Sequence, residues 1–524
     1  MRDSCSYVQP KMVEMTDNMT RNYNNYTSTS KLEQASKQQT LAMDGYDNQG
    51  MLRSELNING NATNVGNTCI NMDSLNSKCG VVGTKSDNAG QLNEKQHFYD
   101  PYQHREVKHP TSYFDTLIHF LKASLGTGIL AMPSAFKNAG YIVGTLGTIA
   151  IGILCTYTIH LLVTASYELC VKRKIPSLTY PGTVAAAFED GPRPVRKFAP
   201  FAKMMTNLFL VLYQIGSSCI YVVFIASNLK AIGDTYLNND TDVRMYMVYI
   251  LIPLILISWI RNLKLLAPFS SIATCMTMVS FTLIFYYIFR EAPSFESREP
   301  VGTIKSIPLF FGTVLFAMEA IGMVLPLENE MKNPKRFGSM FGVLNSSMIP
   351  ISLLYTLVGI LGYLKYGEHV KGSITLDLPH DEVLAQVVKL LLSLSIYICY
   401  ALSNYVAFDI LWKGFEHKME KNEHKICWEY ALRTSIVITT FFFAIAIPNL
   451  EHLISLIGAF CLSSVGIAFP AIVSFLTFNE VYKNAGNFRY SLFCLRNLVI
   501  VIIAIFAFII GVFTSVSDII HHMK

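Results

Sequence analysis

Two ionisable side chains lie inside segments of this chain that are otherwise long and apolar enough to cross a bilayer. His119 falls in the segment 113–136, and Glu319 falls in the segment 306–327. A charge in hydrocarbon costs at least about 2.5–3.5 kcal/mol on insertion scales, so each group needs a partner or a function. Histidine can exchange a proton near neutral pH, and an unpaired carboxylate in such surroundings can also bind and release one. The two residues indicate proton exchange within a membrane; the alternative is that protein groups pair both permanently.

Glycine and proline interrupt both of these segments. The first contains SLGTGILAMP, with Gly126 and Gly128 ahead of Pro133. The second contains LFAMEAIGMVLP, with Gly322 ahead of Pro326. Because lipid offers no hydrogen-bond partners, a spanning helix should keep every backbone N–H and C=O paired. Backbone groups released at such breaks are satisfied where protein or a small polar ligand covers them, and secondary transporters build midplane binding sites in this way.

The residues that border the two breaks are the candidate ligand contacts. Free N–H groups in the half-helix after Gly128 would attract a carboxylate, and the carbonyls released at 124–125 and 316–317 would accept from an ammonium group. An amino-acid zwitterion is complementary to such a site, and Phe316 and Met318 would favour small substrates. The predicted substrate-binding set is Ser124, Leu125, Gly126, Thr127, Gly128, Phe316, Ala317, Met318 and Gly322.

The composition separates this chain from soluble enzymes. Of its 524 residues, 51% are hydrophobic and 15% are charged, whereas globular domains have about 25% charged residues. No GxSxG, HExxH or P-loop pattern occurs, so we expect no enzyme. Apolar runs of about 20 residues suit spanning helices. They predict an all-α membrane protein with eleven spans, at 113–136, 141–169, 200–230, 245–260, 266–289, 306–327, 338–364, 383–411, 428–447, 453–477 and 492–516.

The two interrupted segments are the first and the sixth of these spans. This spacing fits two five-helix units of inverted topology, about 113–289 and 306–477, followed by an extra helix at about 492–516. The transporter region would then cover 113–518. Residues 1–112 are polar and lack an apolar period, so we expect a disordered cytosolic tail that could bind cytosolic partners.

Lysine and arginine gather in alternate loops, which predicts a cytosolic amino terminus and places Asn239 in an outside loop open to glycosylation. Glu328, at the cytosolic end of the sixth span, is expected on a solvated face. The net charge of +5 is small and gives no reason to expect a nucleic-acid partner. The eleven cysteines show no CxxC pairing, so we expect no metal site and no cofactor besides a coupling proton.

Two motifs carry a family resemblance. HFLKASLGTGILAMPSAFKNAG at 119–140 and LFFGTVLFAMEAIGMVLPLENEMKNP at 309–334 resemble the proton-coupled amino-acid transporters of the amino acid/auxin permease group, with insect members most similar. The likeness covers about residues 108–520. It implies a leucine-transporter-like five-plus-five fold with helices 1 and 6 broken. It also implies symport of protons with small neutral amino acids such as alanine, glycine and proline.

The resemblance also implies roles for individual residues. His119 matches the first-span histidine tied to proton coupling, Gly126, Thr127 and Gly128 match the substrate loop, and Glu319 matches the acidic position of the sixth span. The chain departs from the family in having Ala123-Ser124 in place of Gly-Asn, and Met318-Glu319-Ala320 in place of Phe-Glu-Gly. Both departures border the predicted pocket and bear on its substrate range.

Three functions fit these observations. The first is proton-coupled symport, the second is a sodium-coupled or uncoupled amino-acid carrier, and the third is an amino-acid sensor with little transport. Acid-driven, sodium-independent uptake would distinguish the first, and binding without accumulation would distinguish the third. The sequence fits both the plasma membrane and endolysosomal (vacuolar) membranes, because one proton gradient could drive import from outside or export from an acidic lumen.

Overall fold

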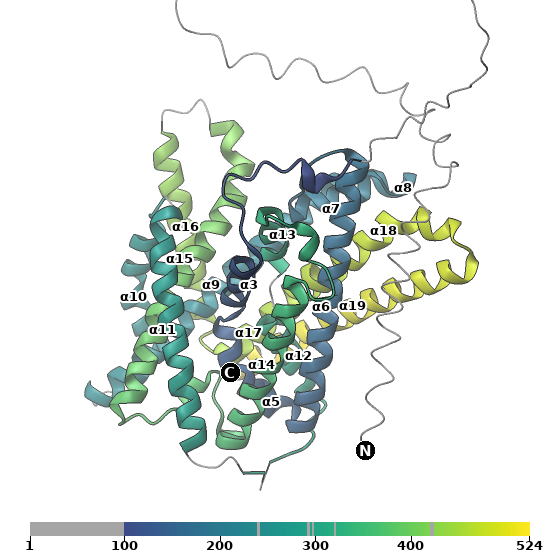
Figure 1. Ribbon diagram of the computed structural model, residues 1–524. Coiled ribbons are helices and arrows are strands. Elements are labelled where there is room, and N and C mark those ends of the chain that lie inside the picture. The colour runs from purple at the N-terminus through teal and green to yellow at the C-terminus, as the bar shows by residue number, and fades with distance from the viewer. Residues whose placement is uncertain are drawn as a thin grey trace, which may run out of the picture. The chain divides into compact units, whose positions relative to one another are not determined.

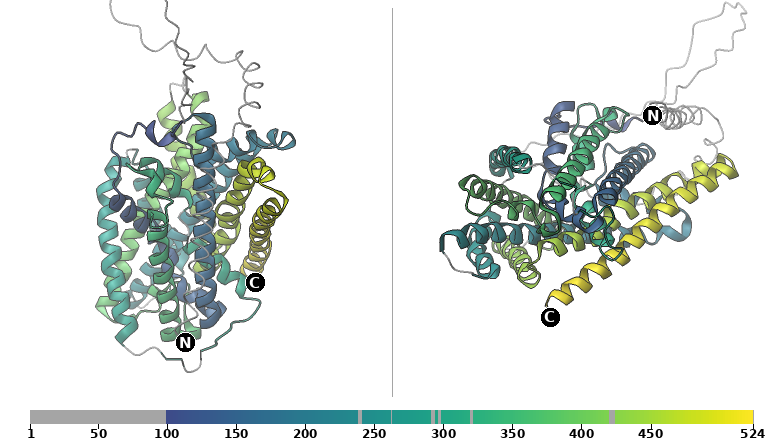
Figure 2. Two further views of the ribbon diagram at one scale, coloured as in Figure 1. Left: turned by 45° about the vertical axis from the view of Figure 1, so that its right-hand side comes forward. Right: turned by 90° about the horizontal axis from the view of Figure 1, so that it is seen from below.

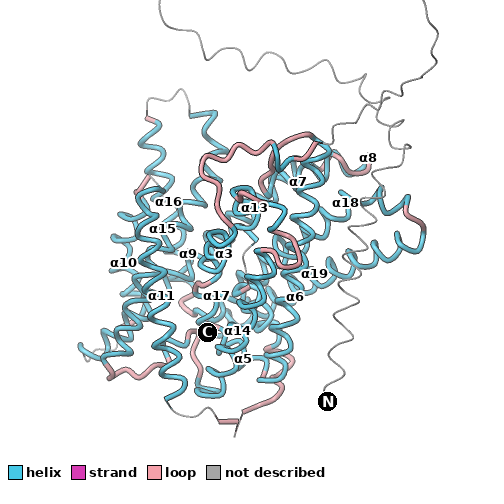
Figure 3. Tube along the Cα trace, viewed as in Figure 1, coloured by secondary structure: helices cyan, strands magenta, loops and turns pink. Residues whose placement is uncertain are grey.

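The computed structural model describes residues 99–237, 241–261, 263–290, 294–295, 298–318, 321–419 and 424–523. All of them belong to the unit Glu94–Lys524. Within these residues the chain is built of helices, and the β-structure consists of one isolated bridge between Thr111 and Met331 (Figure 3). The predicted all-α class is therefore confirmed for the described part of the chain.

The first half of the described chain follows the first five predicted segments. The segment predicted at 113–136 is divided into three short helices. Each of the other four segments is a single helix, and two further short helices precede the one predicted at 200–230. The helices are α3 (Tyr113–Ser124), α4 (Thr127–Leu130), α5 (Met132–Ala139), α6 (Tyr141–Arg173), α7 (Tyr180–Glu189), α8 (Arg193–Arg196), α9 (Ala199–Leu237), α10 (Val243–Ser258) and α11 (Leu263–Arg290) (Figure 1).

The second half follows the remaining six segments, and two of these are also divided. The segment predicted at 453–477 contains a stretch of π-helical geometry, η6 (Gly458–Ala468), between two α-helices. The α-helices are α12 (Ile307–Ala317), α13 (Ile321–Glu330), α14 (Val343–Tyr366), α15 (Val383–Met419), α16 (Lys425–Ala446), α17 (Leu450–Ile457), α18 (Phe469–Asn484) and α19 (Asn487–Met523).

Nine helical stretches among the described residues are long and apolar enough to cross a membrane. The predicted fourth segment, α10, has 16 residues and is shorter than these nine. The predicted first segment is also outside the nine, because it is split into α3, α4 and α5. Membrane-spanning helices are thus present as expected, whereas the count of eleven and the inverted repeat stay predictions.

Packing between distant segments places the two predicted breaks in the interior. The long helix α15 packs against α9 and α11, and α14 packs against α5 and α6. The helices α18 and α19 lie side by side, as both views show (Figures 1 and 2). α12 lies against α17 and η6 at a very close approach: a Cβ added to Gly458 would lie 1.9 Å from the Gly312 carbonyl oxygen. Only glycine fits between these two backbones.

A segment that was predicted as part of the tail packs against the helices. The Arg105 guanidinium donates to the Glu328 carboxylate, with the closest ion-pair atoms 3.1 Å apart, and to the Pro176 carbonyl at 2.9 Å. Thr111 forms backbone hydrogen bonds with Glu330 and Lys332. The expectation that Glu328 is solvated is therefore wrong: its side chain is only 4% exposed, because Arg105 covers it. Residues 1–98 lie outside the described residues.

Candidate functional site

The first break occurs where the sequence analysis places it. α3 begins at a capping box in which the Ser112 side chain accepts from the Asp115 N–H and the Asp115 side chain accepts from the Ser112 N–H. The helix ends at Ser124, and Gly126 is extended, with φ −113° and ψ −155°. α4 then restarts at Thr127 without a side-chain cap. The backbone N–H groups at the start of α4 therefore need hydrogen-bond partners other than a side-chain cap.

At the second break, α12 ends at Ala317, and Met318 donates its N–H to the Val314 carbonyl. The next described residue is Ile321, where α13 begins. Glu319, the predicted proton-coupling carboxylate, lies outside the described residues, and so does the predicted glycosylation site Asn239. Phe316, Ala317 and Met318 are all buried, whereas Gly322 is half-buried.

The two breaks meet in the interior. A Cβ added to Gly128 would lie 2.5 Å from the Ala317 Cα, so α4 and the end of α12 are in direct backbone contact. A Cβ added to Gly126 would meet no other described residue within 4 Å. Gly128 therefore serves the contact between the two helices, and Gly126 leaves open space beside the turn.

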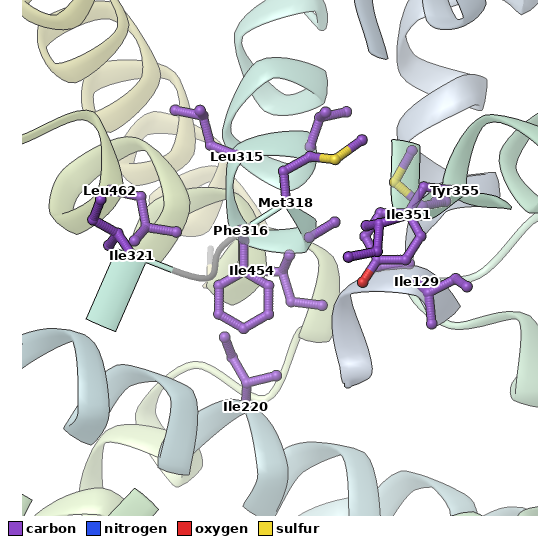
Figure 4. Packing of buried hydrophobic residues seen from close by; sticks show 14 of the residues in the cluster. Ile129, Ile220, Leu315, Phe316, Met318, Ile321, Ile351, Tyr355, Ile454 and Leu462 are labelled. Carbon is purple, nitrogen blue, oxygen red and sulfur yellow. The ribbon is translucent and has the colours of Figure 1, made fainter. Parts of the chain in front are cut away.

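The side chains of Phe316 and Met318 point away from each other. Phe316 packs near Tyr213 of α9, with ring centroids 6.4 Å apart, and faces Ile220 and Ile454 (Figure 4). Met318 extends toward α14, where the Ser352 hydroxyl donates to its sulfur at 3.7 Å. These two residues thus line opposite sides of the second break.

Two hydroxyl groups distinguish the first break. The Tyr355 hydroxyl donates to the Ser124 carbonyl, which also accepts from the Gly126 N–H at 2.9 Å. Protein donors thus occupy a carbonyl that the sequence analysis assigned to a ligand ammonium group. The Thr127 hydroxyl is buried without a hydrogen-bond partner among the described residues. An unpaired buried hydroxyl at a backbone break is available to a polar ligand.

Sequence reasoning missed Tyr355. It lies in the middle of α14, 231 positions from Ser124, and its side chain is fully buried. A tyrosine inside an apolar span is a signal, because its hydroxyl requires a partner there. The identity of that partner depends on how α14 crosses α3.

His119 lies outside this buried group. It is exposed on α3, whereas Thr116, Phe120 and Ser124 on the adjoining face are buried. The structure therefore brings Gly128 of α4 against Ala317 at the end of α12, and it places His119 on the exposed face of α3. Within the described ranges, no group of three or more His, Cys, Asp or Glu side chains could hold a metal ion.

Residues 109–515 match the family described as "Transmembrane amino acid transporter protein". The chain belongs to this family. Membership, together with the nine apolar helices, makes it a multi-pass integral membrane protein of the amino acid/auxin permease group. The predicted resemblance is confirmed at the level of the family.

Two named proteins are similar to this chain over most of their length. The "Proton-coupled amino acid transporter-like protein pathetic" of Drosophila melanogaster is 38% identical over 422 residues, which are 80% of this chain and 88% of that protein. The "Probable amino acid transporter skat-1" of Caenorhabditis elegans is 26% identical over 407 residues, which are 76% of this chain and 88% of that protein.

A solved structure, "Inward facing conformation of Mhp1", shares the fold. It superposes with a TM-score of 0.51 at 12% identity and covers 80% of this chain and 91% of that chain. The likeness supports a leucine-transporter-like fold, whereas the inverted repeat stays a prediction. At this identity the likeness carries nothing about substrate.

Proposed function

We propose that this chain is a secondary active transporter that moves small neutral amino acids, such as alanine, glycine and proline, together with protons. The observation that carries the proposal is the meeting of the two breaks, with Gly128 against Ala317 and space beside Gly126 that no described residue fills. Zwitterions suit a site that offers backbone groups and the unpaired Thr127 hydroxyl. Phe316 and Met318 are buried at the second break, and we expect their side chains to limit the site to small substrates.

Proton coupling is proposed for His119 and Glu319. His119 lies on the exposed face of α3, and imidazole is a common group for proton exchange. The name of the Drosophila relative includes proton coupling. A proton is the only coupling species that this proposal requires. We also propose a cytosolic amino terminus, because lysine and arginine gather in alternate loops.

Uptake of labelled alanine, glycine and proline by cells that express the full chain tests the proposal. We expect uptake to rise as the outside pH falls from about 7.5 to about 5.5 and to persist when sodium is replaced. His119→Ala and Glu319→Gln should remove this pH dependence. His109→Ala, at an exposed histidine outside the predicted spans, is the matched control and should retain it.

Three outcomes decide between the functions. Sodium-dependent uptake without a pH response would support a sodium-coupled carrier. Binding of amino acids without accumulation would support a sensor. Unchanged pH dependence in both variants would show that other groups carry the proton. For an endolysosomal protein, the same measurement is made as efflux from acidic vesicles.

A further inference from the structure

A cavity lies away from the two breaks, between α7, α9 and α18. Its volume is about 310 Å³, near the lower end of the about 300–1,000 Å³ of ligand pockets. Ten side chains line it and all are apolar, among them Phe188 of α7, Phe201 and Phe209 of α9, and Phe469 and Ile472 of α18. Such a lining offers nothing to a polar substrate and suits a hydrocarbon chain.

The mouth of this cavity is positively charged. Phe198, which is 48% exposed, lines the cavity, and the Lys197 ammonium lies 5.3 Å from the centre of its ring. Three further exposed basic residues lie within a few positions along the chain, namely Arg193, Arg196 and Lys203.

The acidic residues next to this cluster do not neutralise it. Glu189 and Asp190 both form ion pairs with Arg173, at 2.8 Å and 3.0 Å. The basic side chains at the mouth are thus left to attract an anion from outside the protein.

The position of the cavity in the fold identifies the source of that anion. It opens where α9 begins, and α9 is one of the nine helices apolar enough to span a membrane. Met204 and Leu208, in the first turns of α9, are exposed apolar side chains. Basic clusters beside a spanning helix attract anionic lipid headgroups. An apolar cavity and a basic rim at the membrane surface therefore match the two parts of one lipid molecule.

We propose that this cavity binds one acyl chain of an anionic phospholipid, with the lipid phosphate held at the basic rim formed by Arg193, Arg196 and Lys197. The site shares no lining residue with the two breaks and is independent of the proposed transport function. A neutral phospholipid has the chain without the net charge, and glycerophosphate has the charge without the chain. Each lacks one of the two features that the site recognises.

Native mass spectrometry of the full chain in detergent tests the proposal with phosphatidylglycerol, phosphatidylcholine of the same acyl chains, and glycerophosphate as probes. Wild type should bind phosphatidylglycerol at least about 10-fold more tightly than phosphatidylcholine and should not retain glycerophosphate. The double variant Arg193→Gln, Lys197→Gln should lose that preference. It leaves Arg196 in place, whose guanidinium donates to the Gly191 carbonyl at 2.9 Å and supports the local backbone.

Two further variants separate the headgroup from the chain. Lys483→Gln with Arg489→Gln removes the same charge from exposed positions at the turn between α18 and α19, and it should keep the preference. Ala202→Phe fills the cavity from α9 and should weaken binding of both phospholipids. Equal binding of the two lipids to wild type, or a preference that survives Arg193→Gln, Lys197→Gln, overturns the proposal. Retention of glycerophosphate by wild type overturns it as well, since the site would then recognise a free phosphate.

Discussion

At the scale of single residues, Gly126 and Gly128 differ in the space beside their α-carbons. Replacement of Gly128 by alanine would bring a methyl group to 2.5 Å from the Ala317 Cα, where backbone has to move. We expect Gly128→Ala to lower the stability by about 1–3 kcal/mol, as overpacking does. Gly126→Ala should leave the melting temperature in detergent unchanged. Equal melting temperatures for the two variants would argue against the close contact of α4 with α12.

Gly126→Ala should instead change which substrate is transported. If the open space beside Gly126 holds the substrate, a methyl group there reduces the room for a side chain. A single methylene in a pocket changes discrimination by about 10–200-fold. We expect the KM for proline to rise at least about 10-fold more than the KM for glycine, measured as competing uptake. A uniform change for both substrates would place the open space outside the binding site.

Tyr355→Phe tests the hydroxyl that holds the first break. The variant leaves the Ser124 carbonyl with one donor, and the loss of one hydrogen bond should cost about 0.5–1.5 kcal/mol. Tyr400→Phe is the matched control, because the Tyr400 hydroxyl is also buried and bonds Thr440 at 2.9 Å, away from the breaks. Both variants should melt slightly earlier, but only Tyr355→Phe should lower the maximal uptake rate. A similar loss of rate in both would assign Tyr355 a purely structural role.

At the scale of helices, the sequence predicts where each helix begins and ends along the chain better than it predicts which other helices it contacts. The fourth segment, predicted at 245–260, is observed as α10 at Val243–Ser258, because apolar runs and their polar ends are local properties. The interruption at Gly126 was also predictable, because glycine weakens a helix at its own position, independently of distant contacts. The contacts of Tyr355 with Ser124 and of Arg105 with Glu328 join residues more than 200 positions apart. Such pairs depend on helix packing, which one sequence does not encode in any local pattern.

Arg105 joins the segment before α3 to α13, and its removal should be costly. Its side chain is 7% exposed and that of Glu328 is 4% exposed, so Arg105→Ala leaves a buried carboxylate without its cation. We expect a loss of about 3–5 kcal/mol. Lys108→Ala, at an exposed neighbouring position, should have no effect. Glu328→Gln added to Arg105→Ala should recover part of the loss in thermal melting, and additive effects of the two changes would contradict a direct pair.

The loop between α14 and α15 should make the stability of the protein depend on pH. Asp377 follows the short helix η5 (Ile374–Leu376) and accepts from the Lys371 N–H at 3.0 Å, but its second carboxylate oxygen is buried without a partner among the described residues. Burial raises the pKa of Asp377 from 3.8 to about 7, against the opposing effect of nearby lysines. The folded protein thus holds this proton over a range in which the unfolded chain has released it.

Stability from Asp377 is therefore fully present below pH 3.8 and is lost as the pH rises through about 7. The slope is at most about 1.4 kcal/mol for each pH unit in this window. Asp377→Asn mimics the protonated side chain and should remove this component, so the variant should gain stability over wild type at pH 8. Thermal melting of both proteins from pH 5 to pH 8 measures the difference. Parallel curves would show that the carboxylate is paired by a group outside the described residues.

At the scale of the whole molecule, the helices form a membrane transporter fold whose described part begins ahead of the first span. The family match starts at residue 109, yet two ion pairs cross that boundary: Arg105 pairs with Glu328, and Asp100 pairs with Lys335 at 2.7 Å. The structural boundary of the transporter therefore precedes the start of the family match at residue 109. A lipid at the rim of α9 would add a further component from outside the chain.

Two truncations test this boundary. Removal of residues 1–93 keeps the whole unit Glu94–Lys524, including Asp100, Arg105 and Thr111, and should leave melting temperature and uptake unchanged. Removal of residues 1–112 strips Glu328 of its buried cation and removes the backbone hydrogen bonds of Thr111 with Glu330 and Lys332. The longer truncation should therefore lose at least as much stability as Arg105→Ala, with uptake falling in parallel, because the same carboxylate is left unpaired in both. If the two truncated proteins melt together, residues 99–112 rest on the helices without stabilising them, and the transporter begins at α3.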